Sequence, residues 1–310
     1  MSCLVSANVS FSPIYIDSVP LVATHDMAPA YGWTSLVLAG LSTAAAIGYV
    51  GGVRRVTRQR LEHGWPRRNT WCFTWGILLC AGVTIGPIGA AATQLFSMHM
   101  VQHIVLMMIA GPLLVLGAPV MLLLRASAPS TRRKRIVPVL RSRGLAVVTN
   151  PVVTWVAFAA VLVGIHFSPV MGILMGWGVL GNVTEILLYL GVSFAYYYTL
   201  LPGNPARNRP SPALRVVSLF LIMIPETITG FFIYSSTAPL VPQFAMMGGA
   251  GAADSVLDQQ FGGSLMWSTG MIIDVAWIAI AVSDWFNDDA RKTRRLDQRI
   301  RAETRGGPLT

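Results

Sequence analysis

Long apolar stretches separated by short polar segments dominate the pattern of this chain. Seven stretches, each with about the 20 residues that a membrane-spanning helix needs, lie at 31–53, 70–92, 96–125, 146–167, 181–201, 213–236 and 263–285. Pro87, Gly111-Pro112 and Pro119 predict bends in the second and third of these helices. The pattern therefore predicts an all-α polytopic membrane protein, a bundle of seven transmembrane helices over residues 31–286.

Composition supports the membrane class and excludes others. Only 12% of the 310 residues are charged, and the mean hydropathy is +0.58, which is not typical of a soluble globular chain. Three cysteines are too few and too scattered for a disulfide framework. Residues 1–30 are expected to form an extracytoplasmic N-terminal arm without a cleaved signal peptide, and residues 287–310 a basic tail.

The basic residues indicate an orientation. All 23 Lys and Arg residues lie within 54–68, 125–143, 207–215 and 291–305, which are the segments on one side of a seven-helix topology. The positive-inside rule makes that side cytoplasmic, so the N-terminus is expected outside and the C-terminus inside. Such clusters are expected to contact the anionic lipid of the bilayer, and nucleic acid is not an expected partner.

The third stretch carries the clearest candidate chemistry. His99 and His103 are four residues apart and share a helical face, and Met107 continues that face one turn deeper. Met100 lies about 100° away from His99 and could join only where the helix end unwinds. Imidazole and thioether are neutral ligands that suit copper, so we expect a copper site at the outer end of this helix. The alternative is that these histidines are interfacial anchors and the methionines fill gaps.

Further polar residues fall near the same membrane depth. His166 ends the fourth stretch, and Glu185 begins the fifth at the depth of His99. Glu226 lies roughly 15 Å below the outer end of the sixth stretch, and Asp274 is at a similar depth in the seventh. Carboxyl groups within the membrane usually face the bundle interior. We therefore predict His166, Glu185 and Glu226 as further candidate ligands, with Glu226 in reach of the histidine face; the alternative for the carboxyls is a bridge between helices.

Other methionines on the outer side are interpreted as packing residues, namely Met171, Met175, Met266 and Met271. His25, Met246 and Met247 also fall on the expected outer side, whereas His63 falls in a basic, inner segment.

Three stretches of sequence resemble one known family. FSMHMVQHIVLMMIAGPLLVLGAP is similar to the HMxxH helix of the polytopic CtaG family, assembly factors of caa-type cytochrome c oxidases. GWPRRNTWCFTWGILL and DQQFGGSLMW agree with it in order, and the resemblance covers roughly residues 30–287. It implies a multi-pass protein of the bacterial inner membrane, not an enzyme, that helps to metallate a haem-copper oxidase whose subunits are its partners. His99, Met100 and His103 occupy the motif positions.

The sequence also departs from that family. Relatives often carry histidines in the fifth and sixth helices, where this chain has Thr184, Glu185 and Glu226. The departure implies a mixed histidine and carboxylate ligand set, or a different metal.

Two other functions stay open on the sequence. The histidines could ligate haem or copper in a redox subunit of a membrane oxidoreductase complex, which would show a Soret band if haem were present. Glu185, Glu226 and Asp274 could instead line the ion path of a transporter, although the two halves of the chain show no internal repeat.

Overall fold

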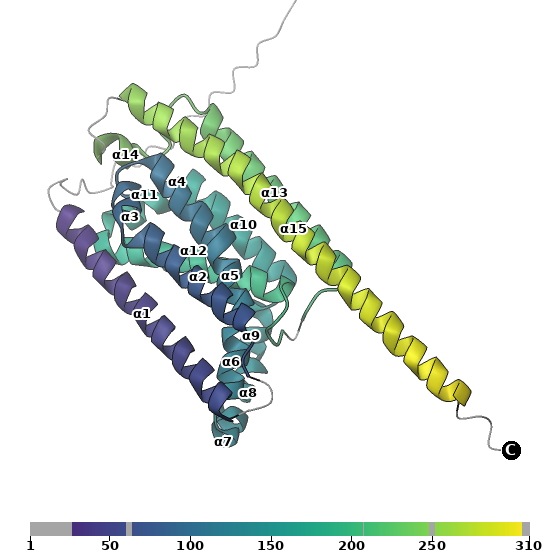
Figure 1. Ribbon diagram of the computed structural model, residues 1–310. Coiled ribbons are helices and arrows are strands. Elements are labelled where there is room, and N and C mark those ends of the chain that lie inside the picture. Colours follow the sequence, from purple (N-terminus) through teal and green to yellow (C-terminus); the bar gives the residue numbers. More distant parts are fainter. Residues whose placement is uncertain (1–26, 60–63, 207, 248–251, 306–310) are drawn as a thin grey trace, which may run out of the picture.

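The computed structural model describes residues 27–59, 64–206, 208–247 and 252–305, and every regular element in these ranges is a helix. The predicted all-α membrane class is confirmed. Helix α1 (Met27–Gln59) lies along one side of the bundle, and α13 (Pro212–Ser235) with α15 (Ala252–Arg305) forms the opposite side (Figure 1). The other helices are α2 (Arg67–Thr84), α3 (Pro87–Ala92), α4 (Phe96–Ile104), α5 (Gly111–Leu116), α6 (Pro119–Ala126), α7 (Pro129–Thr131), α8 (Val137–Leu140), α9 (Arg143–Val148), α10 (Pro151–Phe167), α11 (Val170–Gly176), α12 (Gly178–Leu200) and α14 (Pro242–Met247).

Five helical segments in the described ranges are long and apolar enough to cross a membrane. They are Tyr31–Gln59, Phe96–Ala126, Gly178–Leu200, Pro212–Ser235 and Asp254–Gln298. A sixth candidate is the pair α10 and α11, which bends by 75° at a short break. The described residues therefore contain five or six candidate transmembrane spans, as expected for a multi-pass membrane protein.

The expected span 70–92 is divided in the structure and is not among the candidate spans. Helix α2 ends at Thr84, and α3 begins at Pro87 after a two-residue break. Because α2 starts with Arg67, Arg68 and Asn69, only part of its length is apolar. The count of seven transmembrane helices is not confirmed and stays a prediction.

The third predicted span is the centre of the bundle. Of its most apolar window, 56% is buried among other helices, against 11% for the window in α1. Large apolar side chains on the other spans point outward instead: Leu36 is 64% exposed, Phe220 63% and Ile272 72%. Apolar side chains facing out of a bundle are the expected solution when the surroundings are hydrocarbon. The central helix therefore has the environment in which polar side chains can be kept from lipid.

The central helix is not a regular α-helix throughout. A π-helical segment, Val105–Ala110, follows α4 and leads directly into Gly111-Pro112, where the ring of Pro112 removes one backbone donor. Ser193 on α12 donates a hydrogen bond to the carbonyl oxygen of Met107 within this segment. The backbone then turns at Ala118, whose φ of 51° is in the left-handed region, before Pro119 starts α6. Pro112 and Pro119 thus follow a π-helical segment and a break in the helix at Ala118, and the bends expected at these prolines stay a prediction.

Helices α13 and α15 pack closely because glycines face each other between them. A Cβ atom on Gly263 would lie 2.6 Å from the backbone nitrogen of Tyr234 and 2.8 Å from the carbonyl oxygen of Gly230. No side chain fits there, so small residues allow the two backbones to touch, as in many transmembrane helix pairs. This contact fixes how α13 and α15 face the central helix.

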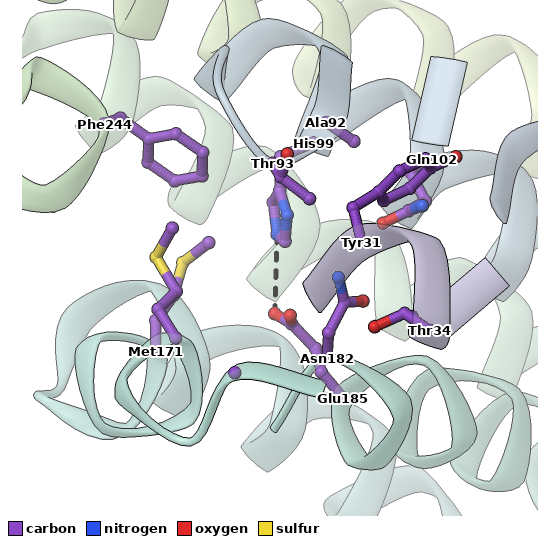
Figure 2. A pocket seen from close by; sticks show the side chains of 12 residues that line it. Tyr31, Thr34, Ala92, Thr93, His99, Gln102, Met171, Asn182, Glu185 and Phe244 are labelled. Carbon is purple, nitrogen blue, oxygen red and sulfur yellow. Dashed lines mark ion pairs between the residues drawn. The ribbon is translucent and has the colours of Figure 1, made fainter. Parts of the chain in front are cut away.

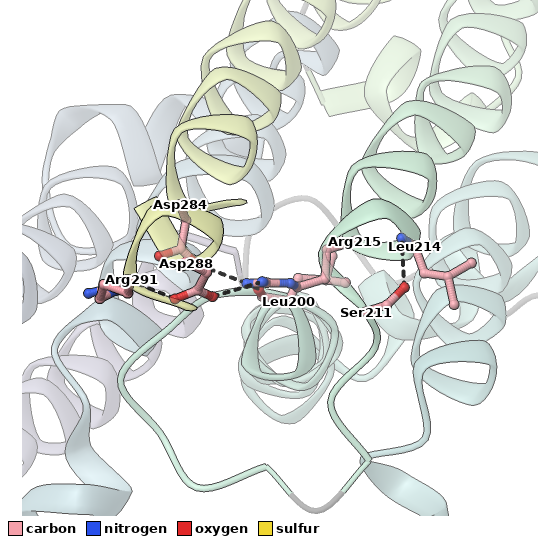
Figure 3. A network of polar contacts seen from close by, with 7 residues as sticks. All are labelled: Leu200, Ser211, Leu214, Arg215, Asp284, Asp288 and Arg291. Atoms are coloured by element: carbon pink, nitrogen blue, oxygen red, sulfur yellow. Dashed lines mark hydrogen bonds and ion pairs between the residues drawn. The ribbon is translucent and has the colours of Figure 1, made fainter. Parts of the chain in front are cut away.

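A buried arginine, Arg215, joins the same two helices (Figure 3). Arg215 is only 4% exposed, and its Nη1 atom lies 2.9 Å from Asp284 Oδ2 and 3.4 Å from the carbonyl oxygen of Leu200. Its Nη2 atom lies 3.8 Å from Asp288 Oδ2, and Asp288 is also 2.8 Å from Arg291. Two acidic residues of α15 therefore compensate a cation that α13 buries.

Candidate metal centre

His99 and His103 lie on one face of α4, and both are buried. The face points at α12, which supplies Tyr189 between the two imidazoles: the ring centroids lie 6.2 Å from His99 and 4.7 Å from His103. The expected sharing of a helical face is therefore present, and the face is turned to the bundle interior.

His99 belongs to a polar trio with two residues of α12. The Tyr189 hydroxyl donates to Glu185 Oε1 at 3.0 Å, and His99 Nε2 lies 3.4 Å from that hydroxyl and 3.6 Å from the same carboxyl oxygen. A carboxyl group next to an imidazole is the usual arrangement that orients a metal-binding histidine. Glu185 thus lies where the sequence predicted it, beside His99.

His103 and His166 form a second pair one turn deeper. Their rings meet edge to face, with centroids 5.2 Å apart and planes at 85°. His166 Nδ1 lies 2.6 Å from the carbonyl oxygen of Leu162, so this nitrogen carries the donated proton and Nε2 keeps a lone pair. That Nε2 atom and both ring nitrogens of His103 are buried without a hydrogen-bond partner. Because a neutral His103 ring carries a proton on one of its two nitrogens, the pair offers two imidazole lone pairs, one from each ring, to a ligand.

The methionine side chains that lie near His99 are not those that the sequence predicted. Met100 is buried against α15, where its Cγ would lie 3.0 Å from a Cβ on Gly262. Met107 is fully buried in the π-helical segment. Met171 and Met175 of α11, interpreted from sequence as packing residues, line the pocket that contains His99. The thioethers that share the His99 pocket thus come from a short helix that the sequence analysis had not assigned to the site.

Figure 2 shows this pocket, in which Met171, Phe244 and Glu185 surround His99 while Tyr31, Thr34 and Gln102 close the other side. Asn182 and Thr93 add further polar groups to its lining. The mixture of imidazole, carboxyl, amide and thioether suits a cation rather than an apolar ligand.

Glu226 faces the interior as predicted, but it is grouped with Asp274 of α15. Apart from the contact with Asp274, neither of its carboxyl oxygens has a hydrogen-bond partner among the described residues. Glu226 Oε2 and the side chain of Met108 both lie beside Gly270 of α15. Glu226 and Asp274 therefore belong to a separate polar group.

In the part of the chain that the structure describes, no three or more His, Cys, Asp or Glu side chains are arranged to hold a metal ion. His25 and His63, and the side chains of Met246 and Met247, lie outside the part of the chain that the structure describes. Sequence reasoning missed Tyr189 as a site residue, although its position four residues after Glu185 places both on one helical face.

A bundle of apolar helices that buries ionisable side chains at its centre defines a multi-pass integral membrane protein. Residues 47–288 match the family described as cytochrome c oxidase caa3 assembly factor (Caa3_CtaG), and the chain belongs to this family. The resemblance identified from the sequence is confirmed.

Among relatives, an uncharacterized protein of Mycobacterium leprae is 25% identical over 274 residues, which cover 86% of this chain and 40% of that protein. Uncharacterized proteins of Mycobacterium bovis and Mycobacterium tuberculosis are each 25% identical over 261 residues, covering 82% of this chain and 39% of theirs. The chain thus spans about two fifths of the length of these curated relatives. No solved structure matches it.

Proposed function

We propose that this chain is a membrane assembly factor for a haem-copper cytochrome c oxidase and that it binds copper at His103 and His166, next to the His99 pocket. Its role is to hold a metal for the oxidase subunits and not to catalyse a reaction. Membership of the assembly-factor family supports the role. The observation that carries the metal proposal is that His103 and His166 each bury an imidazole lone pair without a hydrogen-bond partner among the described residues.

Buried ring nitrogens without hydrogen bonds raise the free energy of the folded protein. A buried polar atom without a hydrogen bond costs on the order of 1–3 kcal/mol, so the unpaired lone pairs of the neighbouring His103 and His166 rings favour a ligand that both can bind. Neutral imidazoles suit a copper ion, and Met107, Met171 or Met175 would favour Cu(I) as a further ligand. Tyr189 and Glu185 would orient His99 beside the ion. The close packing of Tyr189 and His166 around His103 favours a single ion over a haem, which needs an open plane.

The test is the metal content of the purified full-length protein. We expect close to one copper per chain after expression with copper and no Soret band in the optical spectrum. Cells that lack the protein are expected to assemble an oxidase deficient in copper, with the membrane otherwise intact. A metal-free protein together with a fully loaded oxidase in the deletion strain would contradict the proposal, and a b-type haem spectrum would favour the redox-subunit alternative.

The orientation is a second, independent prediction. Figure 1 shows the end of α1 together with α6, α7, α8 and α9 at one end of the bundle, opposite α3, α11 and α14. That end carries the basic clusters, so we propose that it faces the cytoplasm and contacts anionic lipid. A reporter fused after Thr310 is expected to read cytoplasmic, and a tag inserted after Met247 is expected to be labelled from outside. Labelling of the C-terminus from outside would overturn this orientation and place the histidine pocket on the wrong side for the proposed role.

A further inference from the structure

A second group of buried oxygen atoms lies apart from the histidines, at the contact between α13 and α15. Glu226 of α13 and Asp274 of α15 are both buried, and their carboxyl groups lie close enough to affect each other's charge. Within the described part of the chain, the four carboxyl oxygens have no hydrogen-bond partner apart from the contact between the two carboxyl groups themselves. Two carboxylates at such a place are too costly to remain uncompensated, so the pair must hold positive charge, either as a proton shared between the two carboxyl groups or as a bound cation.

Two hydroxyl groups next to the carboxyl pair also lack a hydrogen-bond partner in the described part of the chain. Tyr196, Tyr197 and Tyr198 follow one another on α12, and two of them bond through their hydroxyls: Tyr196 to the Ser218 carbonyl oxygen and Tyr198 to the Pro205 carbonyl oxygen. The hydroxyl of Tyr197 has no hydrogen-bond partner among the described residues although the residue is fully buried, and its charge interactions are with Asp274, Glu226 and Tyr196. Tyr196 and Tyr197 both lie near the carboxyl pair, and of these two only the hydroxyl of Tyr197 is left unsatisfied.

The hydroxyl of Thr229 is also buried and unpaired among the described residues. Elsewhere in the helices, threonine hydroxyls bond the carbonyl oxygen four residues earlier, as Thr57, Thr84 and Thr184 do. Thr229 is fully buried and makes no such bond. It lies three residues after Glu226, on the same face of α13. Its hydroxyl is therefore available to the same ligand.

There is also space beside the carboxyl pair. Gly270 lies one turn before Asp274 on α15, and a Cβ there would be 3.8 Å from Glu226 Oε2 and 3.7 Å from Met108 Cε. A methyl-sized volume next to the carboxyl oxygen is thus left open by the absence of a side chain.

We propose that Glu226 and Asp274, with the hydroxyls of Tyr197 and Thr229, form a second cation site that takes a hard divalent ion. Carboxylate and hydroxyl oxygens are the ligands that Mg²⁺ and Mn²⁺ prefer, and the four side chains offer six oxygen atoms. A divalent ion between two carboxylates leaves no net charge, which removes the main cost of burial. The site differs in ligand chemistry from the histidine centre, and it does not depend on copper binding there.

The test uses Mn²⁺ added to the purified full-length protein in lipid nanodiscs, followed by electron paramagnetic resonance. We expect about one bound Mn²⁺ per chain, with affinity weakened at least 100-fold in E226Q and in D274N. Y197F and T229V keep both carboxyls and are expected to weaken binding about tenfold. Y196F is the matched control, because its hydroxyl is already bonded, and H103A should bind Mn²⁺ normally.

Thermal unfolding without Mn²⁺ shows whether each variant is folded, and Y197F and T229V keep the test decisive if a carboxyl variant is not. Absence of Mn²⁺ binding at about 1 mM, the weak end of oxygen-ligand cation sites, would overturn the proposal. Mn²⁺ binding in E226Q and D274N that is as tight as in the parent protein would overturn it too. An infrared band of protonated carboxyl groups that persists with Mn²⁺ would show a proton-bridged helix contact instead.

Discussion

Replacing His103 by Leu is expected to abolish copper binding and, at the same time, to make the copper-free protein more stable. Both ring nitrogens of His103 are buried and unpaired, so a leucine of similar size removes a desolvation cost from the apo state. In copper-bound protein the same change removes a ligand. We expect at least a 100-fold loss of copper affinity, about 2.7 kcal/mol, and a melting temperature that no longer rises with copper.

The neighbouring residues provide graded comparisons. H166L should lose copper similarly, whereas H99A is expected to weaken it about tenfold, because His99 has Tyr189 and Glu185 as partners and acts beside the ion. H63A changes a histidine that the sequence places in a basic segment and should have no effect. These values come from copper competition titrations and thermal melts in detergent. If H103L melts lower without copper and binds copper as the parent does, His103 is a packing residue and the proposed centre is wrong.

Replacing Arg215 by Met is expected to destabilise the folded protein by roughly 3 kcal/mol, because it leaves Asp284 and Asp288 facing a buried, apolar side chain. The matched control is R291M. Arg291 pairs with the same Asp288, but its side chain is 60% exposed, so its loss should cost less than about 1 kcal/mol.

The double variant R215M/D284L removes both charges of the closest pair and is expected to recover much of the loss, since uncompensated charge and not the missing pair is the main cost. Unfolding in detergent, followed by circular dichroism, measures all three variants. Equal stability of R215M and the parent protein would show that the α13–α15 contact is held by its glycines alone.

Much of the fold could be predicted from the apolar pattern, because a helix in lipid must satisfy its own backbone and needs a long uncharged run. The span 70–92 was harder, since Gly86-Pro87 interrupts a stretch whose average composition hides the break. The π-helical turns after Ile104 have no clear sequence signature. They arise where Pro112 and the Ser193 contact disturb the backbone ladder of the central helix.

The candidate site was predictable in part for the same reason. Helical spacing places His99 and His103 on one face, and depth along the helices brings Glu185 to His99 and His166 to His103. The sequence could not show that Glu226 faces Asp274 instead of the histidines, because this depends on how α13 rotates against α15 at Gly230 and Gly263. Tyr189 was missed because a tyrosine in a span is usually read as packing.

The length of α15 has a mechanical consequence. Its 54 residues run without a break over about 81 Å, and its final part projects well beyond the bundle (Figure 1). Near one end Asp258 bonds Ser97, and further along Asp284 holds Arg215. A slide of one residue would turn the helix by about 100° and break both contacts together. Helix α15 is therefore anchored at two points along its length. A rotation of its projecting end would be transmitted to the contact between Asp258 and Ser97, which lies two residues from His99.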